Sequence, residues 1–318
     1  MTTAWTAGDI PDQTGRRVLI TGANSGIGYM AALKLARKSA TVLMACRDEG
    51  RGKAAMGRLL EEAPGAKIEL VLLDLASLAS VRAVAAREVA RGLPLDLLIN
   101  NAGVMTPPKR LETKDGFELQ FGTNVLGHFA LTGLLIPALE RAAAKATTEA
   151  QRPRVVTVAS IAHKRGKIHF DDLQWKRSYN PMGAYQQSKL ANVMLSLELE
   201  RRLEARNSGV MSVGAHPGVA ETNLFVTGAY PGYELAMRRG IGWLIGGLLN
   251  TDAEGALPTL YAATSPGAAG GGYYGPQGFQ EMRGDEVGAA KIAEQAKDRA
   301  LAAKLWTVCE ELTGVRYL

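Results

Sequence analysis

The chain has 318 residues, of which 47% are hydrophobic and 21% are charged, and its formal net charge is +6. This length and composition are typical of a soluble globular protein that buries a substantial core. The basic residues are spread along the sequence without a long basic block, which argues against nucleic acid as a partner.

Short apolar runs alternate with helical patterns from residue 17 onward. The predicted strands are Arg17–Thr21, Thr41–Cys46, Ile68–Leu73, Leu95–Asn100, Arg154–Ser160, Val210–His216 and Gly272–Gly275. The predicted helices are Ile27–Lys38, Asp48–Glu62, Ser77–Ala90, a long one within Glu118–Lys145, Ala184–Arg206 and Thr251–Thr264. This alternation predicts an α/β fold, a single Rossmann-type doubly wound parallel sheet with helices on both faces.

The pattern contains no internal repeat and no long linker, so we predict one domain over residues 1–318. Within this domain we expect a tail over residues 1–14 and a C-terminal helical extension over residues 284–318. The first residues include Asp9 and Asp12 and no apolar run, so we expect no signal peptide. Cys46 and Cys309 lie far apart and predict no disulfide framework, which favours a reducing cytoplasm. The four histidines show no ligand spacing, and we predict no metal site.

The first predicted strand runs directly into a glycine-containing turn. Gly22, Gly26 and Gly28 follow the spacing G-x-x-x-G-x-G, and the turn also contains Asn24, Ser25 and Ile27. Glycine lets the backbone approach a pyrophosphate closely, and the N-terminus of the following helix offers free N–H groups and a positive dipole. The strand–turn–helix context therefore predicts a dinucleotide site.

Tyr185 and Lys189 are four residues apart in a predicted helix, so their side chains share one helix face. A free phenol titrates near about 10, and a fixed ammonium one turn away favours the phenolate and lowers that pKa. Such a tyrosine can act as a general acid or base. The alternative is a packed phenol beside a lysine that extends its charge to solvent.

These motifs occur together in the order typical of one family. The glycine turn, Asn100–Gly103, Ser160, Tyr185 with Lys189, and Pro217–Gly218 make the chain resemble the short-chain dehydrogenase/reductase family over residues 15 to 280 or so. The stretches Arg165–Phe170 and Ala184–Asn192 are most similar to its retinol dehydrogenase-like branch. This resemblance implies a hydride transfer between a nicotinamide cofactor and a carbonyl/alcohol pair.

The resemblance also assigns roles to individual residues. The implied catalytic residues are Asn124, Ser160, Tyr185 and Lys189. Ser160 would hold the substrate oxygen, and its place at the end of a predicted strand agrees with this role, because open α/β sheets bind ligands at their carboxyl edge. Asn124 would carry a proton relay to Lys189, although a helical asparagine can also simply satisfy backbone groups. Besides the glycine turn, the implied cofactor contacts are Asp74, Leu75, Asn101, Ala102, Gly103, Tyr185, Lys189, Pro217, Gly218, Val219 and Thr222.

The choice of cofactor depends on the end of the second strand. The family places an acid for the ribose hydroxyl where this chain has Cys46, and Arg47 follows. An arginine there can pair with a 2′-phosphate, which predicts NADP(H) as the cofactor, with NAD(H) as the alternative. Arg47 could instead be a surface residue beside Asp48, an N-cap of the next helix. Asp74 could likewise be an N-cap instead of an adenine ligand.

The segment 223–250 departs from the alternating pattern and is rich in glycine, aromatic and aliphatic residues. We predict that it is the substrate lid and that the small-molecule substrate is lipophilic. The alternatives are an interfacial membrane helix and a contact between copies of a homo-oligomer. The sequence thus predicts an NADP-dependent short-chain dehydrogenase/reductase, against two rivals: a nucleotide-sensing protein without turnover, and a membrane-surface or assembly protein.

Overall fold

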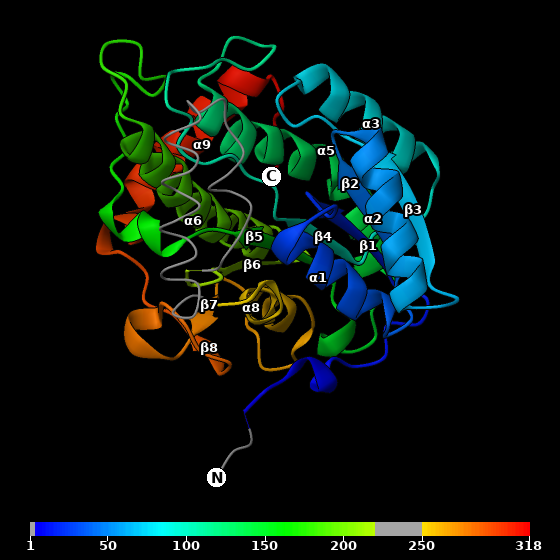
Figure 1. Ribbon diagram of the computed structural model, residues 1–318. Coiled ribbons are helices and arrows are strands. Elements are labelled where there is room, and N and C mark those ends of the chain that lie inside the picture. Colours follow the sequence, from blue (N-terminus) through cyan, green and yellow to red (C-terminus); the bar gives the residue numbers. More distant parts are fainter. Residues whose placement is uncertain (1–3, 220–249) are drawn as a thin grey trace.

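The computed structural model describes residues 4–219 and 250–318. Within this part of the chain, eight strands form one sheet in the order β3-β2-β1-β4-β5-β6-β7-β8. The strands are β1 (Arg17–Thr21), β2 (Thr41–Cys46), β3 (Lys67–Leu72), β4 (Leu97–Asn100), β5 (Arg154–Val158), β6 (Met211–Ala215), β7 (Tyr273–Pro276) and β8 (Val287–Ala289). Every pair is parallel except β7 and β8, which run antiparallel at the edge (Figure 1).

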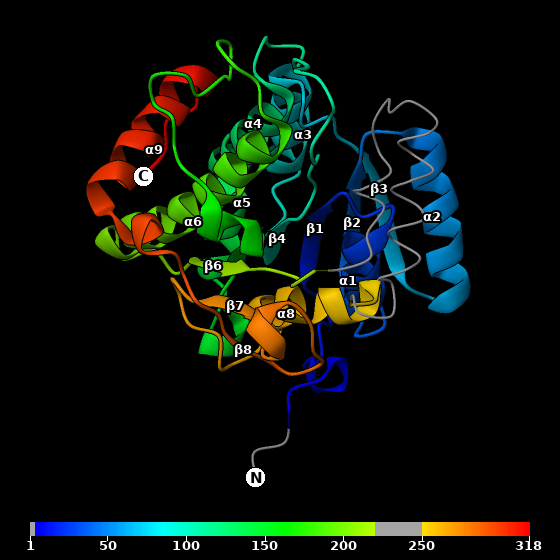
Figure 2. The same ribbon diagram turned by 60° about the vertical axis from the view of Figure 1, so that its left-hand side comes forward.

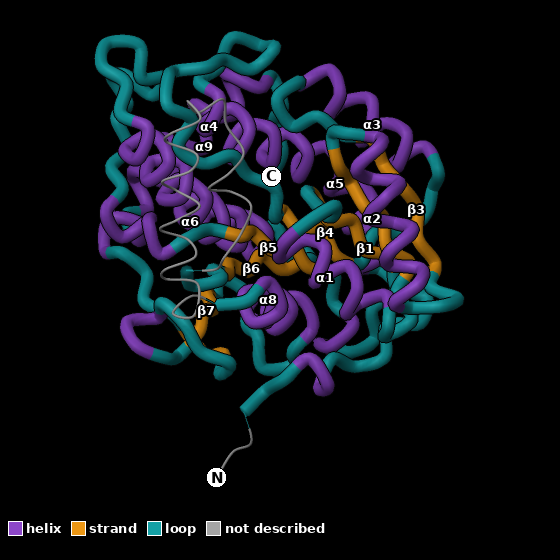
Figure 3. The backbone as a smooth tube through the Cα atoms, viewed as in Figure 1, coloured by secondary structure: helices purple, strands orange, loops and turns teal. Residues whose placement is uncertain are grey.

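Helices cover both faces of this sheet, which forms the central layer (Figure 3). One face carries α3 (Leu78–Ala90), α4 (Leu119–Phe121), α5 (Gly127–Ala143), α6 (Pro181–Ala205) and α9 (Arg299–Thr313). The other face carries α1 (Gly26–Ala36), α2 (Glu49–Glu62) and α8 (Asp252–Thr264), as the turned view also shows (Figure 2).

Alternation along each strand creates the two cores. In β1, Leu19 packs into the core under α3, α5 and α6, whereas Val18 and Ile20 pack into the core under α1 and α8. All five residues of β1 are buried, as expected for a strand covered on both faces. Continuous apolar runs are therefore the sequence signature of this sheet, and the predicted fold class is confirmed.

Two predictions about the secondary structure need correction. Five of the seven predicted strands have an end that differs from the observed end by one or two residues. Helix α6 begins three residues earlier than predicted because Pro181 occupies the first turn. The segment 284–318 is not uniformly helical, since Val287–Ala289 forms β8 before the helix α9. A partly exposed three-residue edge strand has no apolar run that would reveal it.

The run Leu119–Ala143 is apolar and long enough to cross a membrane, but 83% of its most apolar stretch is buried inside the protein. It is the core helix formed by α4, a π-helical turn over Gly122–Leu126, and α5. Glycines at both ends of the turn permit close packing: a Cβ at Gly122 would lie 2.4 Å from Thr113 Cγ2, and one at Gly127 would lie 2.5 Å from the carbonyl oxygen of Leu75. A π-helical turn often marks a functional position.

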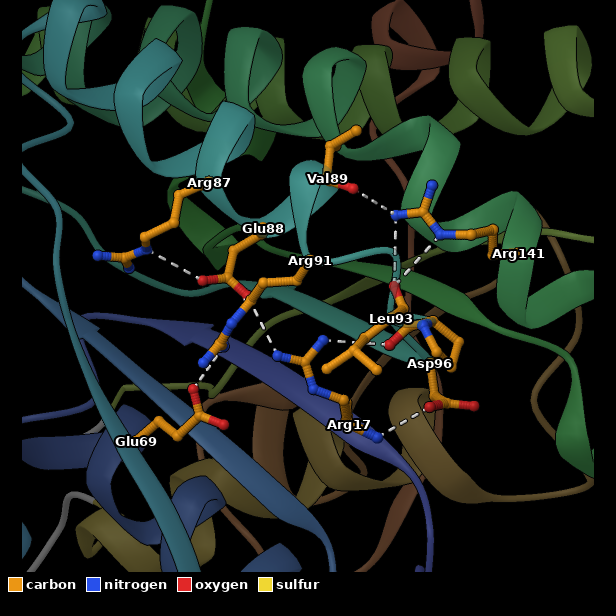
Figure 4. A network of polar contacts seen from close by, with 10 residues as sticks. Arg17, Glu69, Arg87, Glu88, Val89, Arg91, Leu93, Asp96 and Arg141 are labelled. Atoms are coloured by element: carbon orange, nitrogen blue, oxygen red, sulfur yellow. Dashed lines mark hydrogen bonds and ion pairs between the residues drawn. The ribbon is translucent and has the colours of Figure 1, made fainter.

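A network of ion pairs and hydrogen bonds surrounds Arg17 at the start of β1 (Figure 4). The Arg17 guanidinium lies 3.1 Å from the Glu88 carboxylate, and the two side chains are only 10% and 4% exposed. Arg91 bridges Glu88 at 3.2 Å and Glu69 at 2.6 Å, and the Arg17 N–H donates to Asp96 at 2.8 Å. Burial would raise the pKa of Glu88, but Arg17 and Arg91 outweigh it and hold this pKa below the ordinary value. The network thus stabilises the beginning of β1, the end of the strand that lies opposite the β1–α1 turn.

Glu88→Gln should destabilise the fold, because it leaves the buried Arg17 charge without its main partner. Breaking a buried pair costs roughly 3 kcal/mol in unfolding free energy, measurable by urea denaturation at pH 7. A carboxylate with a depressed pKa stabilises the fold above its unfolded pKa of about 4.3 and loses this contribution as the pH falls through the folded pKa. The difference between wild type and variant should therefore shrink below about pH 4.

The matched control is Glu69→Gln, which removes the exposed partner of Arg91. Its side chain is 37% exposed, and such surface pairs contribute at most about 1 kcal/mol. Equal losses for the two variants would contradict the stabilising role assigned to the buried pair.

Candidate active site

A cleft of about 420 Å³ opens at the carboxyl ends of β1, β4 and β5. The strand order changes direction between β1 and β4, and open α/β sheets bind ligands at such a point. The cleft brings together most of the predicted site residues: Gly22, Asn24, Ser25, Gly26, Ile27, Gly28, Asn101, Ala102, Gly103, Ser160, Tyr185, Lys189, Pro217, Gly218 and Val219.

The glycine turn has a backbone that only glycine adopts easily. Gly22 and Gly26 have φ values of +68° and +59°. A Cβ at Gly28 would lie 2.4 Å from the carbonyl oxygen of Gly22 and 2.5 Å from Asn101 Nδ2, so helix α1 could not approach β1 and β4 with a larger residue there. The Ser25 side chain makes no capping bond at the start of α1. The first-turn N–H groups of α1 are therefore available to an anion.

The hydroxyl of Thr21 joins β1 to the turn after β4. It accepts the N–H groups of Asn101 and Ala102, both at 2.9 Å, and lies 2.9 Å from His128 Nε2. The Asn101 side chain donates to the Thr21 carbonyl at 2.8 Å. This bonding fixes the Asn101–Gly103 turn beside the glycine turn.

His128 continues the network toward Asn124. Its Nδ1 lies 3.1 Å from the Asn124 carbonyl oxygen, which can only accept, so Nδ1 carries the proton and Nε2 accepts from Thr21. Burial lowers the pKa of His128 to about 4, which keeps the ring neutral in this arrangement. His128 is therefore a structural residue that connects the end of β1 with the π-helical turn.

Asn124 lies in the π-helical turn, and its side chain is fully engaged. Its Oδ1 accepts from the N–H of Val104 at 2.8 Å, and its Nδ2 donates to the Val104 carbonyl and to Ser188 Oγ, both at 3.0 Å. The side chain thus satisfies backbone groups, the alternative weighed from the sequence. Both side-chain N–H groups of Asn124 are engaged, so the residue could join a proton relay only as an acceptor, through its main-chain carbonyl oxygen or the second lone pair of Oδ1. A Cβ at Gly103 would lie 3.3 Å from Asn124 Oδ1 and 3.7 Å from Lys189 Nζ, so glycine leaves space between these groups.

Tyr185 and Lys189 lie on one face of α6, as their spacing predicted. The Asn180 side chain caps this helix by accepting from the Gly183 N–H at 2.8 Å. Lys189 Nζ donates to the Val158 carbonyl at 3.0 Å and lies 5.8 Å from the centre of the Tyr185 ring. Ser160 follows β5 and caps the 3₁₀ turn Ile161–Arg165, where its hydroxyl accepts from the Ala162 N–H at 3.2 Å.

The expected lowering of the Tyr185 pKa is not observed. Burial raises the pKa of Tyr185 to about 12, and a hydrogen bond with Ser160 only partly opposes this shift. Burial also lowers the pKa of Lys189 to about 8. Desolvation penalises both charged forms, so burial pushes each group toward its neutral form.

Three predicted cofactor residues, Arg47, Asp74 and Leu75, are not among those that line the cleft. Arg47 is exposed after β2 and makes no hydrogen bond or ion pair with any other described residue, while Asp48 caps α2 by accepting from the Arg51 N–H at 2.7 Å. Asp74 accepts from the Ala76 N–H at 3.1 Å and pairs with Lys114 at 3.1 Å. Leu75 is buried against α5. Thr222 and residues 223–249 of the predicted lid lie outside the described residues.

Several residues that shape the cleft were not predicted from the sequence. Met105, Ile161, Ala162 and Met182 line it near Ser160 and Tyr185. Thr21 was given no role, although its position at the end of a predicted strand, directly before Gly22, was a usable signal. The apolar wall residues carried no comparable signal, because an apolar side chain has no spacing or chemistry that distinguishes a cleft wall from the core.

The cleft fits a dinucleotide on the evidence of its own residues. The positive-φ glycines and the uncapped start of α1 suit a diphosphate. The Lys189 ammonium has three donors, of which the Val158 carbonyl takes one, so others can reach ribose hydroxyls. Fold and cleft together define a Rossmann-type nucleotide-binding protein.

Comparison with known proteins gives the family. The sequence model of the short chain dehydrogenase family matches residues 16–228. The chain is similar to polyprenol dehydrogenase of Mus musculus, with 42% identity over 96% of this chain and 86% of the relative. It is 39% identical to retinol dehydrogenase 14 of Homo sapiens over 95% of this chain and 87% of the relative. A crystal structure of an uncharacterised protein from Mycobacterium paratuberculosis has a TM-score of 0.76 and 39% identity, covering 99% of this chain and 100% of that one.

The chain therefore belongs to the short-chain dehydrogenase family, in its retinol dehydrogenase-like branch, as the motifs predicted. Membership makes it an oxidoreductase with a nucleotide-binding fold and implies a small-molecule substrate.

Proposed function

We propose that the protein is an NADP(H)-dependent oxidoreductase that interconverts a lipophilic carbonyl compound and its alcohol. The observation that carries this proposal is that Ser160, Tyr185 and Lys189 line the same cleft as the glycine turn. When bound there, the nicotinamide supplies or accepts the hydride. The protein's own residues bind and orient the reactants and move the proton.

Tyr185 is the proposed acid. With its pKa raised to about 12 by burial, the phenol is protonated at neutral pH, which is the state that a proton donor to a reduced carbonyl oxygen needs. The Ser160 hydroxyl donates a second hydrogen bond to the same oxygen and stabilises the charge that develops there. Oxidation of an alcohol requires the phenolate, so added positive charge near Tyr185 would favour that direction.

Lys189 supplies positive charge and hydrogen-bond donors. Burial lowers its pKa to about 8, so the amine remains largely protonated at neutral pH. Its bond to the Val158 carbonyl aims the ammonium between β5 and α6, on the wall shared with Tyr185. We propose that Lys189 donates hydrogen bonds to the ribose hydroxyls of the cofactor and stabilises the phenolate form of Tyr185.

Arg47 is the proposed ligand of a 2′-phosphate. It lies exposed directly after β2, and its guanidinium forms no hydrogen bond or ion pair with another described residue that a phosphate would have to displace. Asp48, whose carboxylate could have opposed a phosphate, is engaged in capping α2. Asn24 and Ser25 of the glycine turn line the cleft and add neutral hydrogen-bond donors.

The lipophilic substrate is supported by the walls around Ser160 and by the names of relatives. Met105, Ile161, Ala162 and Met182 present apolar surface next to Ser160 and Tyr185. Two relatives are named for polyprenol and retinol, which are lipophilic alcohols. We therefore propose that the reacting carbon lies between these apolar walls.

We also retain the cytoplasm as the proposed location of the protein.

Tyr185→Phe should reduce kcat by about 100-fold or more, because general acid catalysis commonly contributes 10²–10⁴ in rate. NADPH affinity, measured by fluorescence titration, should change little, since only a hydroxyl is removed. The matched control is Tyr261→Phe, which removes a hydroxyl outside the cleft. If the Tyr185 variant retained kcat within about tenfold of wild type, a loss of only about 1.4 kcal/mol, Tyr185 would not be the acid.

Arg47→Ala should weaken NADPH binding by roughly ten- to a hundredfold, because a charge-assisted hydrogen bond contributes about 1.5–3 kcal/mol. NADH binding should remain within about twofold, since NADH lacks the 2′-phosphate. Arg206→Ala, at the exposed end of α6 far from the cleft, serves as the charge control. An unchanged ratio of the two dissociation constants would return Arg47 to the surface-residue interpretation.

A further inference from the structure

Glu281 connects three segments at the edge of the cleft. Its side chain is 12% exposed, and its Oε2 lies 2.7 Å from Lys164 Nζ and 3.4 Å from His216 Nε2. Its Oε1 accepts from the N–H of Lys291 at 2.9 Å. Burial would raise the pKa of Glu281, but His216 and Lys164 outweigh it and lower this pKa to about 2. Glu281 is therefore an anion at any working pH.

The contact with His216 reaches the cofactor side of the cleft. His216 Nδ1 accepts from the N–H of Gly218 at 3.2 Å, so a neutral ring must carry its proton on Nε2, the atom that faces Glu281. At 3.4 Å this contact is longer than an ordinary hydrogen bond, but the carboxylate favours the same tautomer electrostatically. Glu281 thereby orients the imidazole that holds Gly218.

The backbone after Glu281 holds the same turn directly. The Met282 carbonyl accepts from the N–H of Val219 at 2.7 Å, and Gly218, at φ +71°, approaches so closely that a Cβ would lie 2.4 Å from the Met282 oxygen. Gln280 and Glu281 have φ values of +50° and +59°, which non-glycine residues keep only when their surroundings enforce them. The contacts of the Glu281 carboxylate provide that enforcement.

The contact with Lys164 reaches the substrate side. Lys164 belongs to the 3₁₀ turn Ile161–Arg165, which Ser160 caps. Within this turn, His163 Nδ1 lies 2.7 Å from the Ser160 carbonyl oxygen. The Lys164–Glu281 ion pair therefore fixes the loop that carries Ser160 against the turn that carries Gly218 and Val219.

We propose that Glu281 is a positioning residue that sets the separation of these two walls and so aligns the Ser160 hydroxyl with a nicotinamide bound beside Val219. This inference rests on the proposed function. It assigns to Glu281 no contact with substrate or cofactor, only control over the residues that make such contacts.

The test compares Glu281→Gln and Glu281→Asp with wild type. Glu281→Gln should raise the dissociation constant for NADPH and reduce kcat, with a combined fall in kcat/KM of ten- to a hundredfold, because small misplacements of reacting groups have effects of this size. NADPH binding is measured by fluorescence titration without substrate. Glu281→Asp keeps the charge and should recover part of both losses, and Lys164→Gln, which removes the partner charge, should lower kcat in the same direction.

The control is Glu198→Gln. Glu198 is a similarly buried carboxylate bonded to Arg201 and Arg202 on α6, outside the cleft, so its variant should lower the melting temperature without changing kinetics or NADPH affinity. Melting-temperature losses at both sites with unchanged kinetics and affinity at Glu281 would overturn the proposal. If Glu281→Gln does not fold, the Asp and Lys164 variants decide by the same criterion. Wild-type protein that neither binds NADPH nor reduces carbonyl compounds would instead refute the proposed function.

Discussion

The site depends first on the Thr21 hydroxyl at the end of β1. It accepts two backbone N–H groups from the turn after β4 and contacts His128, so the ends of two neighbouring strands are tied at one atom. Helix α1 packs against this junction only because Gly28 lacks a side chain. The glycine turn, the Asn101–Gly103 turn and the main-chain carbonyl of Asn124 are thus held in one hydrogen-bonded frame, and the two turns line the cleft.

Burial dominates the electrostatics of the chemical groups. Tyr185 and Lys189 lose solvation together, so each is pushed toward its neutral form. The phenol stays protonated and the ammonium stays close to its titration point. A pair in this state responds strongly to a nearby charge, because desolvated groups are poorly screened.

Features that depend on neighbouring residues in the sequence were predicted, whereas features that depend on contacts between residues far apart in the sequence were missed. Arg17–Thr21 and Thr41–Cys46 form strands with the predicted bounds, because strands covered on both faces are continuous apolar runs. The four-residue spacing of Tyr185 and Lys189 placed them correctly on one face of α6. Glu281 could not be found in this way, since its partner Lys164 is 117 residues away in the sequence. Nor could spacing show that the Asn124 side chain would form hydrogen bonds with Val104 and Ser188.

The central claim is that this cleft transfers a hydride between nicotinamide and a carbonyl carbon. The most direct measurement uses the two forms of NADPH that carry deuterium on one or the other face of C4, each incubated with the protein and a lipophilic aldehyde. A fixed nicotinamide in the cleft predicts that mass spectrometry finds deuterium on the carbinol carbon of the product from one form only. Product without deuterium from either form, or NADPH binding without any alcohol formed, would contradict the account.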